Sequence, residues 1–263
     1  MSLPFIKMHG TGNDFVILDA RTVPLPTSLD FQRLADRRFG VGCDQIIILR
    51  PSRTADVFMD IRNSDGSPSG ACGNATRCVV KLLGSSIRIE TAAGLLEGHL
   101  EADGTITVDL GPVRLDWREI PLAKALDTNA LTFDELPLGC AINVGNPHCV
   151  FFVPNVEAID LATIGRRLEH HPLFPERCNI EFAEALGDNR FRVRVWERGS
   201  GVTLACGTGA VAVGVAAFRR KLAGRHTTII MDGGTLYIEY LPDGHGLLRG
   251  EAVRVFEGVW EGS

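Results

Sequence analysis

Short apolar runs, separated by turns rich in Gly, Asn and Asp, recur along the whole chain and predict a protein built mainly of β-strands. The expected strands are residues 5–8, 15–18, 46–49, 57–61, 87–90, 95–100, 105–110, 141–144, 149–153, 180–184, 191–196, 227–231, 236–240 and 253–256. Longer runs with apolar residues at helical spacing predict helices at 31–38, from Cys72 to Gly84, at 161–170 and at 207–221. Polar loops at 63–70 and 198–204 precede two of these helices.

The two halves of this pattern repeat each other. Cys72 and Cys206 each stand directly before a helical run, and they lie 134 positions apart. Polar residues recur at almost the same offset, pairing Asn13 with Asn146, Gln45 with Asn179, and Asn63 with Glu197. Several such coincidences in the same order indicate a duplicated unit, with one cysteine in each copy.

The duplication predicts an α+β fold of two pseudo-symmetric domains. Each domain is expected to be a mostly antiparallel β-sheet or barrel that closes around one central, apolar α-helix. We place the domains at residues 1–120 and 121–263, joined by the irregular stretch 117–137, and leave open whether the last strand returns to the first domain. The active site is expected in the cleft between the two domains.

Composition narrows the function classes. With 263 residues, 45% of them hydrophobic, the chain has the composition of an ordinary globular protein. A net charge of −5, with no strong local cluster of Lys and Arg, argues against nucleic acid as a partner. The N-terminus lacks a signal-peptide pattern, and no apolar run approaches the ~20 residues that span a bilayer. Seven cysteines, an odd number, fit reduced thiols, so we expect a cytoplasmic protein without a membrane partner.

The two repeated cysteines carry the candidate chemistry. A helix N-terminus offers unpaired N–H groups and a positive dipole end, which favour a thiolate and can bind a substrate carboxylate. One thiol of a facing pair can therefore act as a base while its partner stays protonated. Such a pair can remove a proton from one face of a carbon and return one to the other face. The predicted reaction is inversion at the α-carbon of an amino acid by two-base catalysis.

The polar motifs, taken together, resemble those of the diaminopimelate epimerase family. They are KMHGTGNDF at 7–15, NSDGS at 63–67, CGN at 72–74, NVGNPH at 143–148, ERGSG at 197–201 and CGTG at 206–209. The resemblance covers essentially the whole chain. It implies interconversion of L,L- and meso-diaminopimelate, a small-molecule substrate, in the synthesis of lysine and of peptidoglycan precursors. It further implies that no pyridoxal phosphate, other cofactor or metal is needed, and that the protein forms a homodimer, as the family often does.

The resemblance also assigns roles to residues. Cys72 and Cys206 would be the alternating acid and base, and His148 and Glu197 would tune the thiol pKa values. The residues implied to bind the substrate are Asn13, Gln45, Asn63, Gly73, Asn74, Asn146, Asn179, Glu197, Arg198, Gly207 and Thr208. Arg198 beside Glu197 offers the cationic and anionic partners that a second amino-acid centre requires.

Other interpretations stay open. The sequence GTGAVA at 207–212 fits a loose dinucleotide-binding fingerprint, but ten residues separate it from the preceding strand, where the fingerprint requires a direct turn. A related racemase acting on proline, hydroxyproline or histidine would share the fold. A non-catalytic sheet protein with accidental cysteines is the third alternative. The remaining cysteines are expected to be small buried hydrophobes, and they are Cys43, Cys78, Cys140, Cys149 and Cys178.

Overall fold

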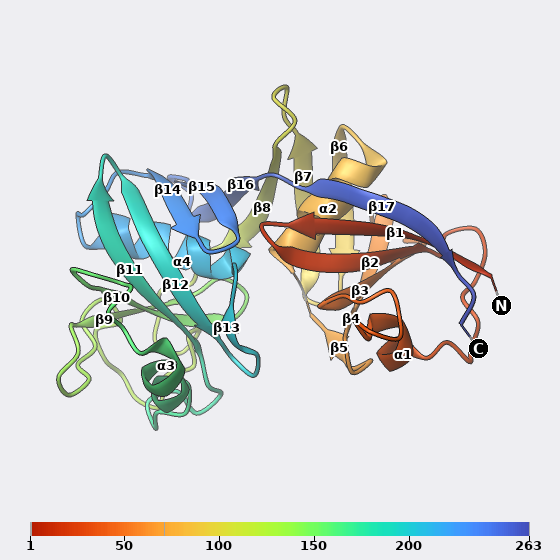
Figure 1. The fold of residues 1–263 in the computed structure, drawn as a ribbon. Coiled ribbons are helices and arrows are strands. Elements are labelled where there is room, and N and C mark those ends of the chain that lie inside the picture. The colour runs from red at the N-terminus through yellow and green to blue at the C-terminus, as the bar shows by residue number, and fades with distance from the viewer. Residues whose placement is uncertain (1, 71, 263) are drawn as a thin grey trace. The chain divides into compact units, whose positions relative to one another are not determined.

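The computed structural model describes residues 2–70 and 72–262, so Ala71, the residue before Cys72, lies outside the described part. The chain divides into two compact units. The first unit runs to Val108 and takes up the chain again from Gly250, and the second comprises Asp109–Arg249 (Figure 1). We describe each unit by itself.

The first unit is a sheet packed against one central helix. Its strands are β1 (Leu3–Gly10), β2 (Asn13–Asp19), β3 (Gln45–Arg50), β4 (Val57–Asn63), β5 (Pro68–Ser69), β6 (Ser86–Thr91), β7 (Gly94–Leu100) and β17 (Val253–Trp260), with β8 (Ile106–Pro112) running into the second unit. Helix α2 (Gly73–Leu83) contacts β1, β6 and β7, and its residues 73–80 are all buried. A short helix, α1 (Phe31–Ala35), contacts β3.

The second unit repeats this plan. Its strands are β9 (Gly139–Asn143), β10 (Pro147–Phe152), β11 (Asn179–Gly187), β12 (Arg190–Glu197), β13 (Gly201–Thr203), β14 (His226–Met231), β15 (Gly234–Tyr240) and β16 (His245–Gly250). Helix α4 (Gly207–Arg219) contacts β9, β10, β11, β14 and β15 and is buried along most of its length. Helix α3 (Leu161–Glu169) packs on the sheet through β11, β12 and β13.

The order of strand pairings shows the duplication directly. In the first unit β1–β2 is antiparallel, β2–β3 parallel, β3–β4 and β4–β5 antiparallel, β4–β6 parallel and β6–β7 antiparallel. The second unit repeats these senses in β9–β10, β10–β11, β11–β12, β12–β13, β12–β14 and β14–β15. The structure therefore confirms the predicted fold class, two repeated β-rich halves that each enclose one helix.

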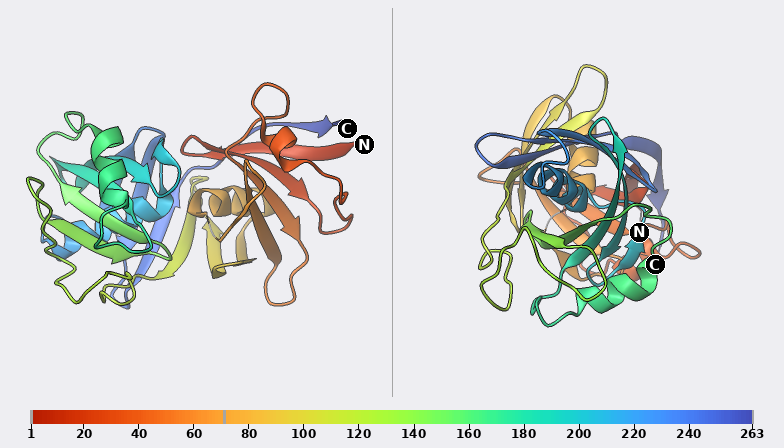
Figure 2. Two further views of the ribbon diagram at one scale, coloured as in Figure 1. Left: turned by 90° about the horizontal axis from the view of Figure 1, so that it is seen from below. Right: turned by 90° about the vertical axis from the view of Figure 1, so that its left-hand side faces the viewer.

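The boundary between the units differs from the one at 120/121 that the sequence suggested. The stretch expected to join the halves belongs to the core of the second unit, because Ile120, Leu131 and Phe133 are buried there against the strands. The division consequently falls within β8, between Val108 and Asp109. The last strand does return to the first unit, where β17 lies antiparallel to β1 (Figure 2).

Most predicted elements are present, with a few corrections. Strands β5 and β13 lie inside the stretches expected to be loops, and β16 was not expected. Helix α1 ends at Ala35 and not at Arg38, because the Asp36 side chain accepts hydrogen bonds from the backbone N–H groups of Arg38 and Phe39 and turns the chain out of the helix. Within residues 2–70 and 72–262, no helix is long and apolar enough to cross a membrane.

Candidate active site

Each unit presents a cysteine at the start of its central helix. Cys72 is the N-cap of α2, with φ −149° and ψ 109°, and Cys206 is the N-cap of α4, with φ −127° and ψ 115°. Both residues are extended, so the helix begins immediately after them. The Cys206 sulfur accepts from the Gly209 N–H of the first turn, whereas Cys72 makes no side-chain capping bond to its helix. The structure thus places both cysteines at helix N-termini, as the sequence predicted. The first turns are formed by Gly73 and Asn74 in α2 and by Gly207 and Thr208 in α4.

In the first unit, Asn13 connects the thiol to the helix. The Cys72 Sγ lies 3.6 Å from the Asn13 Oδ1, and the Asn74 amide nitrogen lies 3.4 Å from the same oxygen. The Asn13 amide nitrogen in turn donates to the Asp44 carboxylate at 3.0 Å. Asn13 is therefore held with its oxygen toward Cys72. Asp44 was not among the expected site residues.

A cluster of charged residues lies next to Asn13 in the chain and in space. Asp14 accepts hydrogen bonds from Arg37 and Lys7, and Arg37 also reaches Asp44 at 2.7 Å. Although burial opposes it, these bonds hold the pKa of Asp14 below its ordinary value. The cluster stabilises the turn that carries Asn13.

Gln45 and Asn63 form a second polar pair in this unit. They lie opposite each other on β3 and β4, and the Gln45 amide nitrogen donates to the Asn63 Oδ1 at 3.0 Å. The Asn63 amide nitrogen donates to the Ser67 hydroxyl at 3.1 Å. Gln45 begins β3 and Asn63 ends β4, so the register brings these two residues, which the family resemblance assigns to substrate binding, to the same edge of the sheet.

A buried cation lies in the helix that carries Cys72. Arg77 is fully buried in α2 and donates to the Thr11 hydroxyl at 3.1 Å and to the Glu251 carbonyl oxygen at 3.2 Å. Burial lowers the pKa of Arg77 to about 10, and the neighbouring Cys78, Cys72 and Glu251 act in the opposite direction. Arg77 therefore stays protonated at neutral pH, and its charge would favour a thiolate at Cys72. The sequence analysis missed Arg77, because a single arginine in an apolar helix carries no recognisable spacing.

In the second unit, the thiol is more deeply enclosed. Cys206 is 5% exposed, and its Sγ lies 3.4 Å from both the Thr208 hydroxyl oxygen and the Gly209 backbone nitrogen. Burial raises the pKa of the Cys206 thiol well above its ordinary value, and the Glu197 carboxylate adds to this. The hydrogen bonds from Thr208 and Gly209 lower the pKa of this thiol, but the net shift remains upward. The expected lowering by the helix N-terminus is thus outweighed, and Cys206 is a protonated thiol at neutral pH.

Glu197, at the end of β12, is linked to this thiol. Its carboxylate accepts hydrogen bonds from the Thr203 hydroxyl and from Cys206. Burial raises the pKa of Glu197, although these two hydrogen bonds and the nearby His148 lower it. The contact with Cys206 gives Glu197 the position that a residue tuning this thiol requires.

His148 and Asn146 lie beside each other at the start of β10. The His148 Nε2 is 2.9 Å from the Asn146 Oδ1, and its Nδ1 is 2.6 Å from the Glu181 Oε1. Glu181, on β11, was not expected in the site. It stands within a run of apolar strand residues, where the sequence gives no signal that distinguishes a buried functional carboxylate.

Asn179 and Arg198 are joined through the backbone. The Asn179 Oδ1 accepts from the Arg198 backbone N–H at 2.9 Å, and its amide nitrogen donates to the Pro147 carbonyl oxygen at 2.9 Å. The Arg198 guanidinium is exposed and donates to the Glu176 carbonyl oxygen at 3.0 Å. Asn179 therefore shapes the loop that presents Arg198.

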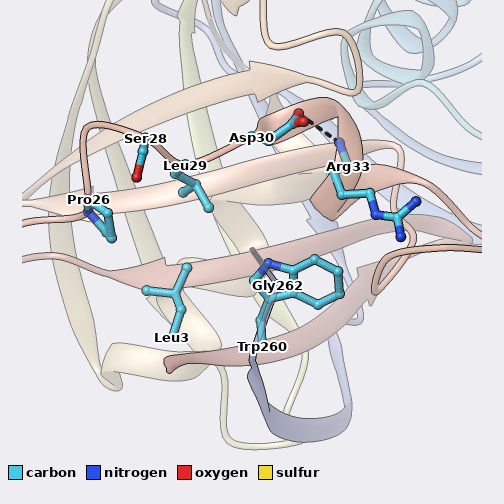
Figure 3. A pocket seen from close by; sticks show the side chains of 8 residues that line it. All are labelled: Leu3, Pro26, Ser28, Leu29, Asp30, Arg33, Trp260 and Gly262. Carbon is cyan, nitrogen blue, oxygen red and sulfur yellow. Dashed lines mark hydrogen bonds between the residues drawn. The ribbon is translucent and has the colours of Figure 1, made fainter. Parts of the chain in front are cut away.

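Two further features bear on the candidate chemistry. Among the residues that the structure describes, no three His, Cys, Asp or Glu side chains are arranged to hold a metal ion. A pocket of about 110 Å³ lies in the first unit, lined by residues that include Leu3, Leu29 and Trp260 (Figure 3). None of the expected site residues lines this pocket, so it is separate from the Cys72 region.

Comparison with known proteins decides the family. The sequence profile described as diaminopimelate epimerase matches residues 5–115 and 140–255. The chain belongs to the diaminopimelate epimerase family. A diaminopimelate epimerase of Rhodospirillum centenum is 55% identical over 97% of this chain and 91% of its own length. One of Rhizorhabdus wittichii is 52% identical over 97% of this chain and 94% of its own length.

Solved structures of more distant proteins share the fold of this diaminopimelate epimerase family member. A phenazine biosynthesis protein of the PhzF family from Bacillus anthracis superposes with a TM-score of 0.69 at 17% identity, covering 98% of this chain and 99% of that chain. A hydroxyproline epimerase from Agrobacterium vitis gives a TM-score of 0.70 at 14% identity, covering 98% of this chain and 90% of that chain. At these identities the likeness concerns the fold alone.

Proposed function

We propose that this protein interconverts L,L- and meso-diaminopimelate by two-base catalysis, with Cys72 and Cys206 as the reacting thiols. The observation that carries the proposal is the cysteine N-cap that begins the central helix of each repeated unit. Membership of the diaminopimelate epimerase family, with a match over nearly the whole chain, supports the substrate.

The two thiols take opposite protonation states at the start of the reaction. Cys206 carries its proton, since burial and a neighbouring carboxylate disfavour the thiolate. For the first proton to leave, Cys72 must donate its own proton, now directed at the Asn13 oxygen, and act as the thiolate, which the buried Arg77 charge in the same helix favours. Cys72 removes the α-proton from one isomer and Cys206 delivers a proton to the opposite face of the same carbon. For the other isomer the roles exchange.

Backbone donors bind the reacting carboxylate. Gly73 and Asn74, and Gly207 and Thr208, form the first turns that follow the two cysteines, so their N–H groups have no partner within the helix. Their partial positive charge stabilises the negative charge that develops on the α-carbon and its carboxylate when the proton leaves.

The remaining polar residues would recognise the second, non-reacting amino-acid centre. Arg198 supplies a cation for its carboxylate, and the amide side chains offer donors and acceptors for both groups. These amides are Asn13, Gln45, Asn63, Asn146 and Asn179. Glu197 supplies the anion for the ammonium group while it also contacts Cys206.

A racemase for proline or hydroxyproline is the second candidate, because a hydroxyproline epimerase shares the fold. Its sequence identity of 14% is far below the values near 50% for diaminopimelate epimerases. The second zwitterionic centre of diaminopimelate also accounts for Arg198, which a proline-type substrate would leave without a carboxylate.

Proton NMR in D2O tests the proposal. Reduced protein is incubated with L,L-diaminopimelate without any added cofactor, and the α-hydrogen signal and the meso isomer are followed. We expect loss of α-hydrogen together with meso product. Exchange and inversion of hydroxyproline or proline, with none of diaminopimelate, would move the assignment to the second candidate.

We also propose that the protein works in the cytoplasm as a homodimer. A mechanism that needs a thiol and a thiolate requires a reducing compartment. Four apolar side chains of β17, Val253, Val255, Phe256 and Val259, are exposed and would suit a contact between two copies. Sedimentation of the purified protein measures the oligomeric state directly.

A further inference from the structure

The second unit contains a buried pair of ionisable side chains, Glu181 and His148, and the mechanism above gives no role to Glu181. Glu181 and His148 are both 0% exposed, and the Glu181 Oε1 lies 2.6 Å from the His148 Nδ1. In the parallel pairing of β10 and β11, Glu181 stands opposite Val150, two residues from His148, so both side chains point to the same face of the sheet. Val150 belongs to the core that α4 completes, and the pair therefore faces α4.

The first turn of α4 makes room for this carboxylate. A Cβ added at Gly209 would lie 2.8 Å from the Glu181 Oε1 and 3.4 Å from the Cys206 Sγ. Any residue larger than glycine would displace the carboxylate. Glu181 thus lies directly behind the turn that carries Cys206.

The hydrogen bonds of His148 fix where its protons are. The Asn146 Oδ1 can only accept, so the His148 Nε2, 2.9 Å away, carries a proton. A second proton lies in the short bond between the His148 Nδ1 and the Glu181 carboxyl. Whichever of these two atoms holds it, the pair has no net charge, which is the form that suits a dry interior.

The remaining oxygen of Glu181 agrees with this arrangement. Its Oε2 is buried and has no hydrogen-bond partner among the described residues. A carboxylate left with one unbonded oxygen would be costly in such a site, whereas sharing a proton with His148 reduces that cost. A stability role alone would be better served by an apolar residue of similar size.

We propose that Glu181 is a positioning residue for the epimerase reaction. By bonding the His148 Nδ1, it keeps the Nε2 proton on the Asn146 oxygen and so holds the Asn146 side chain with its NH2 group free to donate to the substrate. The inference rests on the proposed role of Asn146 in substrate binding. It predicts that Glu181 affects the reaction through Asn146, without touching the substrate.

The test compares Glu181→Leu with Glu181→Gln. Leucine removes the partner of the His148 Nδ1, so we expect the KM for diaminopimelate to rise about tenfold with a smaller change in kcat. Glutamine can donate to the Nδ1 through its amide and should restore most of the affinity. Glu184→Gln, on the same strand, is the matched control, since its carboxylate accepts from the Val156 N–H at 2.9 Å and should leave both constants unchanged.

A double-variant cycle separates positioning from packing. If Glu181 acts through Asn146, then Glu181→Leu adds nothing to the loss caused by Asn146→Ala. Losses that multiply in full would overturn the proposal. If the leucine variant does not fold, Glu181→Met carries the same expectations.

Nitrogen-15 NMR of His148 in the wild-type protein gives a readout that does not depend on activity. The signal is assigned by its loss in His148→Gln, and we expect a proton on Nε2 that is lost or moved in Glu181→Leu. A wild-type ring with its only proton on Nδ1 would refute the inference on its own. Protein that shows the expected ring signals but never epimerises diaminopimelate would instead refute the proposed function.

Discussion

The two central helices begin in the same way, yet opposite charges are buried near them. Cys72 heads a helix that contains the buried cation Arg77. Cys206 heads a helix whose N-cap thiol is hydrogen-bonded to the carboxylate of Glu197. The backbone angles of the two N-caps are similar, so the difference lies in the side chains around them.

This contrast teaches how a duplicated fold can supply two unlike thiols. Strand order and helix placement were kept in both copies, and they fix where each sulfur stands. The buried groups diverged, and around Cys206 they favour the protonated thiol. A two-base reaction needs this inequality, since two thiolates or two thiols at the start would leave one role unfilled.

Removing either thiol should have the largest effect on epimerisation. We expect Cys72→Ala and Cys206→Ala each to lower epimerisation by about 10³-fold or more. Each variant keeps one thiol, so slow exchange of the α-hydrogen without inversion can persist with one isomer. Proton NMR in D2O with both pure isomers measures exchange and inversion separately. A single variant that inverts at the wild-type rate would exclude the two-base scheme.

Removing the buried cation should make Cys72 resemble Cys206. Arg77→Met removes the positive charge that favours the thiolate form of Cys72. We therefore expect alkylation of Cys72 by iodoacetamide at pH 7 to slow about tenfold. Mass spectrometry of the Cys72 peptide follows the rate.

Two variants control this experiment. Arg77→Lys keeps the charge and should stay close to wild type. Lys81→Met removes one positive charge from the same helix, but from an exposed side chain. An equal slowing in Lys81→Met would attribute the effect to general charge and not to Arg77.

Neutralising the carboxylate near the other thiol should move Cys206 in the opposite direction. The Glu197 charge helps to raise the pKa of Cys206, so Glu197→Gln lowers it. Because the thiolate is the reactive form, the pH profile of Cys206 alkylation should shift to lower pH, by about one unit. Because burial still raises the pKa in the variant, Cys206 remains a thiol at neutral pH. A shift to higher pH would mean that the hydrogen bond to Glu197 matters more than its charge.

The sequence predicted the repeated parts of the molecule well, since repetition is visible in one chain. The recurrence of Cys72 and Cys206 at a fixed offset led to the two helix N-termini and to the fold class. Asn13 and Asn146 were found in the same way. Local patterns also identified most strands, because each has apolar residues bounded by turn residues.

The parts that could not be predicted depend on contacts between distant segments. Glu181 and Arg77 look like ordinary members of apolar elements, and only the folded unit shows that one meets His148 and the other Thr11. The domain boundary was misplaced for the same reason, since the irregular stretch that holds Ile120 and Phe133 is defined by what it packs against. Short strands such as β5 and β13 form only because a longer neighbour, β4 or β12, offers an edge.

The return of β17 to β1 has a consequence for the order in which the chain can acquire its structure during synthesis. The second unit is one continuous segment, so it can fold as soon as it has left the ribosome. The first unit must wait, because β1 stays without its β17 partner, and Arg77 without the Glu251 carbonyl, until the residues from Gly250 onward have been made. Until then the helix that carries Cys72 is held only in part, and the half of the molecule that begins first is completed last.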